Sequence, residues 1–198
     1  MRRFLATAAV LGLIAGASGQ ARAELITFTE TAIATGTLGG TPYINALITL
    51  TSTADTTAVT ENSGFFSVIN TSATVDVPLI GTAAFAPSST TFDNQTFNPP
   101  AAGIASGGFS ILDTFSATFG SYDLKSSIGP IVGPAFINSN EPFSTSMGDF
   151  IITSVSGDVT FTAVLQGAVP EPGTFGMAGT AVIVGLGASW YRKRRRIA

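Results

Sequence analysis

The sequence contains no cysteine and no histidine. Without histidine, a Ser-His-Asp triad, a histidine-ligated zinc site and a metalloprotease helix are all excluded. Without cysteine, disulfides, thiol catalysis and thiolate metal sites are excluded as well. The folded part of the chain must therefore gain its stability from burial, and the phenylalanines, 15 in the whole chain, supply bulky apolar volume for a core.

Positive charge is almost missing from the centre of the chain. Between Glu24 and Val169 the only basic residue is Lys125, against eleven carboxylates. Nucleic-acid binding depends on Lys and Arg contacts to phosphate, so this composition excludes a nucleic-acid partner. The other basic residues gather near the two ends, which indicates that the ends and the centre have different tasks.

The first 23 residues have the features of a signal peptide. Arg2 and Arg3 precede a short apolar run over residues 4–17, and Ala21 and Ala23 flank Arg22. A basic start, an apolar centre and a small–x–small site form the pattern that signal peptidase accepts. We expect cleavage between Ala23 and Glu24, which leaves residues 24–168 as the exported body. The alternative is a retained N-terminal anchor.

The C-terminal region has the features of a transmembrane segment. Residues 174–191 carry no formal charge, and as a helix they would reach about 27 Å, close to the hydrocarbon thickness of a bilayer. Trp190 and Tyr191 end the segment with rings that favour the membrane interface. By the positive-inside rule, the cytoplasmic side is set by the basic residues that follow, Arg192, Lys193, Arg194, Arg195 and Arg196. We therefore expect the acidic body to face away from the cytoplasm.

Directly before this segment stands the motif Val169-Pro170-Glu171-Pro172-Gly173. Each proline restricts the residue before it to extended backbone, so the motif presents the narrow strip that a protease or transpeptidase cleft accepts. With the apolar segment and the basic cluster, residues 169–198 resemble a PEP-CTERM sorting domain. The resemblance implies an exported protein of a Gram-negative bacterium that an exosortase cleaves near the motif and delivers to the cell surface. A plain single-pass membrane protein, with its tail intact, is the alternative.

The body, residues 24–168, is rich in short alternating runs. In "GDVTFTAVLQG", for example, Val159, Phe161 and Ala163 alternate with Thr160 and Thr162, as in a half-buried strand. We predict an all-β body, an antiparallel β-sandwich or jelly-roll-like domain. Strands are expected near 25–37, 44–54, 64–78, 80–86, 108–119, 149–155 and 158–166. Residues 87–107, rich in Pro, Gly and Asn, are expected to form a long loop or an insertion.

Candidate chemistry in the body is sparse, and no catalytic residue is assigned. Lys125 is the sole candidate for a Ser-Lys base, but Ser126 and Ser127 are its neighbours in sequence and would point elsewhere in a strand, so a solvated lysine is favoured. A glycosidase needs only two carboxylates across a cleft. The carboxylates available for such a pair are Asp113, Asp123, Glu141, Asp149 and Asp158.

A metal site is not assigned either. The acidic body suits the oxygen ligands of a structural Ca²⁺, and "FDNQT" around Asp93 is suggestive, but no EF-hand loop is present. No other cofactor is expected.

Together these features predict a non-enzymatic, exported cell-surface or biofilm-matrix protein with a structural or adhesive role, associated with exopolysaccharide. Exosortase and signal peptidase are its expected processing partners. One alternative is a carbohydrate-binding module, in which Tyr43, Tyr122 and exposed phenylalanines stack on sugar rings. An aromatic platform or groove would favour that alternative, and fully buried aromatics would count against it. A carboxylate-based glycosidase is the further alternative.

Overall fold

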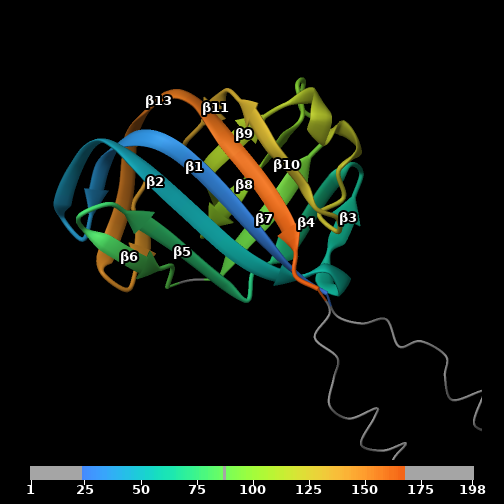
Figure 1. Cartoon of the computed structure of the whole chain (residues 1–198), viewed down its shortest axis with the longest axis horizontal. Helices are drawn as coiled ribbons and strands as arrows, with labels where there is room; N and C mark the ends of the chain where they lie inside the picture. Colours follow the sequence, from blue (N-terminus) through green and yellow to red (C-terminus); the bar gives the residue numbers. More distant parts are fainter. Residues whose placement is uncertain (1–23, 87, 168–198) are drawn as a thin grey trace, which may run out of the picture. The chain divides into compact units, whose positions relative to one another are not determined.

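The computed structural model describes residues 24–86 and 88–167, and these residues form two antiparallel β-sheets joined by turns and two short 3₁₀-helices, Thr56–Ala58 and Ala117–Ser121 (Figure 1). The prediction of an all-β body is confirmed. The signal peptide, the sorting motif 169–173, the segment 174–191 and the basic cluster 192–196 lie outside the described residues. None of the described residues belongs to a helix with the length and hydrophobicity that a membrane crossing requires.

The first sheet has the strand order β10-β13-β1-β2-β5-β6, and β12 pairs with the start of β13. Its strands are β10 (Ile128–Gly133), β13 (Gly148–Leu165), β1 (Leu25–Leu38), β2 (Thr41–Asp55), β5 (Ser72–Val77), β6 (Gly81–Ala84) and β12 (Phe143–Thr145). Along β1, every second side chain from Ile26 to Leu38 is buried, and the threonines between them face outward. The threonines of neighbouring strands are in register: Thr162 of β13, Thr29 of β1, Thr51 of β2 and Thr74 of β5 form one row on the outer face.

The second sheet has the strand order β11-β9-β8-β7-β4-β3. Its strands are β11 (Ala135–Phe136), β9 (Phe109–Phe115), β8 (Ala101–Ser106), β7 (Ser89–Asn94), β4 (Phe65–Ile69) and β3 (Thr60–Asn62). The two sheets lie face to face (Figure 1), and each apolar cluster of the core takes side chains from both. The largest fully buried side chains are Phe28, Phe119, Phe150 and Phe161, whose burial contributes roughly 1.5–3 kcal/mol each.

Three predicted strands and one predicted loop need correction. The expected strand 64–78 is two strands, β4 and β5, in different sheets: the Asn70 N–H donates to the Ser89 carbonyl in the second sheet, and the Thr71 N–H donates to the Thr53 carbonyl in the first. The expected strands 149–155 and 158–166 are one strand, β13. Gly157, where φ is +77°, forms a bulge within the strand and does not end it in a turn. The segment 87–107 is not a long loop, since it contains β7 and β8.

The first and last described strands end side by side. Ile26 pairs with Leu165, and the Gln166 N–H donates to the Leu25 carbonyl at 2.7 Å. In Figure 1 the blue start of β1 and the orange end of β13 accordingly meet at one end of the two sheets. The outer face of the second sheet is a different part of the surface, and it holds the candidate site.

Candidate ligand-binding pocket

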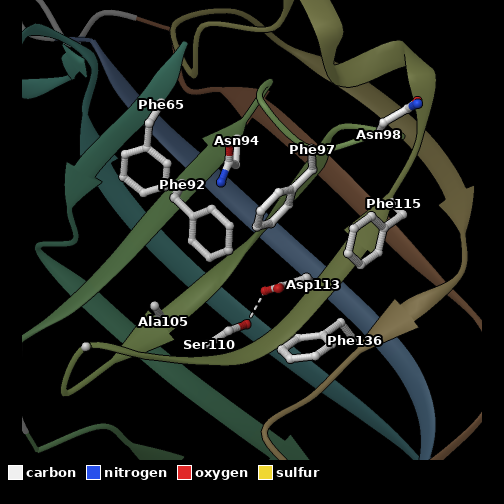
Figure 2. Close-up of a pocket in the computed structure, with 11 residues that line it drawn as sticks. Phe65, Phe92, Asn94, Phe97, Asn98, Ala105, Ser110, Asp113, Phe115 and Phe136 are labelled. Atoms are coloured by element: carbon white, nitrogen blue, oxygen red, sulfur yellow. Dashed lines mark hydrogen bonds between the residues drawn. The ribbon is translucent and has the colours of Figure 1, made fainter. Parts of the chain in front are cut away.

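An open pocket of about 530 Å³ lies on the outer face of the second sheet (Figure 2). Its walls are phenylalanine rings from four strands and one connection, Phe65, Phe92, Phe97, Phe115 and Phe136. The polar side chains that line it are Asn94, Asn98, Ser110 and Asp113. We call this site the Phe pocket. Its volume is within the range of about 300–1,000 Å³ that is usual for small-molecule sites.

The pocket follows from the strand register. Ile104 of β8 and Leu112 of β9 are part of the core, so their neighbours Gly103 and Asp113 face outward. One row across the outer face therefore reads Ser67, Phe92, Gly103, Asp113 and Phe136. The next row reads Phe65, Asn94, Ala101 and Phe115. The central strand β8 contributes only glycine and alanine to these rows, so the large rings on either side enclose a trough.

The connection from β7 to β8 completes the wall. Asn94 Oδ1 accepts from the Thr96 N–H at 3.0 Å and from the Thr96 hydroxyl at 2.6 Å, which turns the chain back over the sheet. Phe97 then stacks on Phe115, with ring centroids 6.1 Å apart, and on the other side Phe65 stacks on Phe92 at 5.8 Å. Phe97 and Phe136 stay about half exposed, at 46% and 47%, so each ring keeps apolar surface that a ligand could contact.

Asp113 occupies the floor of the Phe pocket. Only 3% of this residue is exposed, and Figure 2 shows its carboxyl between Phe92 and Phe97 on one side and Phe115 and Phe136 on the other. Ser110 donates a hydrogen bond to Oδ1, and within residues 24–86 and 88–167 the carboxyl has no other hydrogen-bond partner. Ser110 and Asp113 reach the same face because a bulge between them opposes Ile104–Ala105 of β8. Burial raises the pKa of Asp113 to about 7, against the lowering effect of Ser110.

Glu30 lies behind Asp113, on the inner face of the first sheet. It is completely buried, Oε1 accepts from the Thr114 hydroxyl at 3.1 Å, and Oε2 has no partner among the described residues. Burial, and next the negative charge of Asp113, raise the pKa of Glu30 well above its usual value. The raised pKa favours the neutral form of Glu30 in the core, and Asp113, with a pKa of about 7, is the member of this pair that faces the pocket.

A belt of buried polar side chains runs between the two apolar clusters. On β1, Glu30 separates Phe28 from Ala32, and on β2, Ser52 separates Leu50 from Ala54. Thr91 joins the sheets, since its hydroxyl lies 2.8 Å from the Ser52 hydroxyl and donates to Asn70 Oδ1 at 2.9 Å. These contacts satisfy polar groups that would otherwise weaken the core.

Asp93 belongs to this polar belt and does not line the pocket. It is completely buried; its Oδ2 accepts from Gln95 Nε2 at 3.1 Å, and its Oδ1 has no partner in the described part of the chain. Burial raises the pKa of Asp93 to about 7. The described residues hold no group of three or more Asp, Glu, His or Cys side chains that could bind a metal ion. The suggested Ca²⁺ site at Asp93 thus gains no supporting geometry.

The structure brings only one of the five candidate carboxylates into the pocket. Asp113 is there, whereas Asp123 and Glu141 are half-buried elsewhere, and Asp149 and Asp158 are exposed. The carboxyl that interacts with Asp113 is Glu30, which was not among the candidates and is sealed in the core. No two of the five candidates therefore line this pocket together.

Lys125 is exposed, in agreement with the expectation of a solvated lysine. Its backbone N–H donates to Asp123 Oδ1 at 3.0 Å. The Ser127 hydroxyl accepts from the Leu165 N–H at 2.9 Å, and the Ser126 backbone carbonyl accepts from the Tyr122 hydroxyl at 3.1 Å.

The prediction that Tyr43 and Tyr122 stack on a ligand is wrong. Both are buried in the core, at 5% and 3% exposure, and their hydroxyls donate to the backbone carbonyls of Ile151 and Ser126, each at 3.1 Å. Burial raises the pKa of both tyrosines. In the described part of the chain, the large exposed aromatic side chains are phenylalanines.

Sequence reasoning missed much of the pocket because it lies in the segment expected to be a loop. Phe92, Asn94, Phe97, Asn98 and Ala105 all fall within residues 87–107. A usable signal was present: in "TTFDN" residues 90–94 alternate between the two faces, and "AAGIAS" places only small residues at every second position.

No family model, curated protein or solved structure matches this chain. The assignment of a function therefore depends on the residues and on the geometry of the Phe pocket.

Proposed function

We propose that this chain is an exported cell-surface protein whose body binds extracellular polysaccharide through the Phe pocket, without catalysing a reaction on it. Its role is then structural or adhesive, as a component of the biofilm matrix. The proposal also assigns the two packed sheets to the β-sandwich, jelly-roll-like class of binding domains.

The observation that carries the proposal is the Phe pocket itself. Sugar rings have apolar C–H faces and hydroxyl edges, so they bind where exposed aromatic rings stand beside hydrogen-bonding side chains. Phe97 and Phe136 offer such faces, and Asn94, Ser110 and Asp113 offer hydrogen-bonding groups. A glycosidase with two catalytic carboxylates is less well supported. The carboxyl that interacts with Asp113 is that of Glu30, and Glu30 is completely buried in the core, where it cannot face a substrate across the pocket.

The sorting part of the proposal depends on the sequence of the two ends. The signal peptide 1–23 with its Ala21-Arg22-Ala23 site supports export, and the motif 169–173, the apolar segment 174–191 and the basic cluster 192–196 support processing by an exosortase. Before processing, the chain would be held in the inner membrane, with its body outside the cytoplasm.

Binding is tested with the full chain purified in detergent, titrated calorimetrically with a panel of soluble oligosaccharides. Replacing Phe97 or Phe136 with Ala should weaken binding about three- to tenfold, because one stacking face is lost. Phe109→Ala is the matched control, since Phe109 is similarly exposed but does not line the Phe pocket. If no oligosaccharide binds, or if Phe109→Ala weakens binding as much as Phe97→Ala, the pocket is not a glycan site.

Processing is tested by measuring the intact mass of the protein recovered from the surface of the cells that make it. The mature chain should begin at Glu24 and end near the motif 169–173. A mature chain that extends to Ala198 would show a plain membrane protein in place of an exosortase substrate.

A further inference from the structure

The Phe pocket combines aromatic walls with one carboxyl group at its centre. Phe92, Phe97, Phe115 and Phe136 surround Asp113 (Figure 2), and the small side chains of β8 leave space for a ligand beside it. An uncharged sugar needs aromatic faces and hydrogen-bonding groups, but it does not need a carboxyl at the point where the rings converge.

A positively charged group fits this arrangement better than a neutral one. The faces of aromatic rings carry negative partial charge and attract cations, and a carboxylate within the same enclosure adds a direct ion pair. Apart from the bond from Ser110, no described residue satisfies the Asp113 carboxyl, so it is free to accept hydrogen bonds from a ligand. Among residues 24–86 and 88–167, no lysine or arginine lines the Phe pocket to neutralise Asp113.

The charge of the whole body points the same way. Eleven carboxylates stand against the single basic residue Lys125 between Glu24 and Val169. Such a charge distribution raises the local concentration of cations and repels anionic polymers. Anionic polysaccharides are therefore poor candidates for the ligand.

On these grounds we propose that the ligand of the Phe pocket is an amino sugar with a free ammonium group, as part of a polysaccharide. Its ammonium binds at Asp113, and its ring lies against the phenylalanines. This proposal rests on the proposed glycan-binding function. Glu30, in the opposite sheet, is the acidic group that faces Asp113; it is completely buried, and its raised pKa favours the neutral form, which opposes the ionisation of Asp113 less than a carboxylate would. Binding of the ammonium favours the ionised form of Asp113 and therefore lowers its pKa from the value in the free protein.

The test compares three tetrasaccharides that differ in one property. They are a β-1,4-linked glucosamine tetramer, its fully N-acetylated counterpart, and a neutral β-1,4-linked glucose tetramer. Titrations use the full chain in detergent at a pH of about 7 and about 0.15 M salt, where long-range attraction is largely screened. The glucosamine tetramer should bind about tenfold or more tightly than the other two, as expected for a hydrogen bond to a charged group.

Replacing Asp113 with Asn should remove this preference while leaving weak binding of all three tetramers. Asp158→Asn is the matched control: it removes one carboxylate from an exposed position and should leave the preference intact. Phe136→Ala should weaken binding of all three tetramers and keep their order. Thermal unfolding of each variant shows that it is folded, and Asn suits the buried position because it carries no charge.

The outcomes separate the two proposals. If the three tetramers bind equally well, or if Asp113→Asn keeps the preference, the amino-sugar assignment is wrong and glycan binding stands. If trilysine competes as well as the glucosamine tetramer, the pocket recognises ammonium groups without the sugar, which also overturns the assignment. If no tetramer binds, the proposed function itself fails.

Discussion

At the scale of single residues, the chemistry of the Phe pocket depends on Asp113 and its hydrogen-bond donor Ser110. Asp113 is buried by the rings that line the pocket, and this desolvation raises its pKa to about 7. Ser110 favours the charged form, because it donates to Oδ1. Burial and the hydrogen bond from Ser110 act in opposite directions, and together they leave the pKa of Asp113 close to neutral pH.

Replacing Ser110 with Ala should raise the pKa of Asp113 further, because the hydrogen bond that favours the carboxylate is lost while the burial remains. The pKa is measured by NMR titration of the Asp113 side-chain carboxyl carbon. Ser154→Ala, an exposed position on β13, is the control and should leave this titration unchanged. An unchanged or lowered Asp113 pKa in Ser110→Ala would contradict the role given to Ser110.

At the scale of elements, strand β8 determines the shape of the Phe pocket. Its outward-facing residues are Ala101, Gly103 and Ala105, between the phenylalanines of β7 and of β9 and β11. Gly103 is the most restrictive of these positions. A methyl group there would collide with Asp113 Oδ1 and with the Leu112 carbonyl. Only glycine therefore leaves space for the Asp113 side chain to pack against the backbone of β8.

Gly103→Ala should therefore displace Asp113 or strand β9, lower the free energy of unfolding by about 1–3 kcal/mol, and weaken oligosaccharide binding. The measurements are urea unfolding and calorimetric titration. Gly120→Ala is the matched control, because a methyl group there makes only an ordinary contact, 3.7 Å from Pro100. If Gly103→Ala unfolds and binds like the unchanged protein, β8 does not define the pocket in the way described.

At the scale of the whole molecule, buried acids make stability depend on pH. Burial raises the pKa values of Asp93 and Asp113 to about 7 and that of Glu30 well above its usual value. A carboxyl whose pKa is higher in the folded state stabilises the fold below its unfolded pKa, and this contribution is lost as the pH rises through the folded pKa. The loss therefore takes place between about pH 4 and about pH 7 for the two aspartates.

The free energy of unfolding should fall as the pH rises across this window, by up to about 1.4 kcal/mol per pH unit for each aspartate. Urea unfolding at several pH values measures it. Asp93→Asn and Asp113→Asn should each flatten the dependence, whereas Asp158→Asn, at an exposed position, should not. A protein that becomes more stable as the pH rises from 4 to 7 would show that these carboxyls are ionised and well solvated in the fold.

Much of the fold was accessible from alternation along the chain. Residues 158–165 have apolar side chains at every second position, and so do residues 25–38 except at Glu30 and Gly36; both runs lie in long strands with those apolar side chains facing the core. Proline, glycine and asparagine were less reliable. They indicated a loop over residues 87–107, but Asn94 ends a strand there and Gly103 lies inside one, because the register of the sheet requires a small residue beside Asp113.

By itself, the sequence determined the all-β body, the exclusion of histidine and cysteine chemistry, the acidic charge of the body, and the predicted export and sorting signals at the two ends. Those properties depend on composition and on short-range pattern. Only the tertiary structure decided that Tyr43 and Tyr122 are buried, that Phe97 and Phe136 are exposed, and that Asp113 is the one candidate acid that lines the Phe pocket among the described residues. The reason is that exposure and proximity are set by which strands pair and in what register, and pairing joins residues that are distant along the chain.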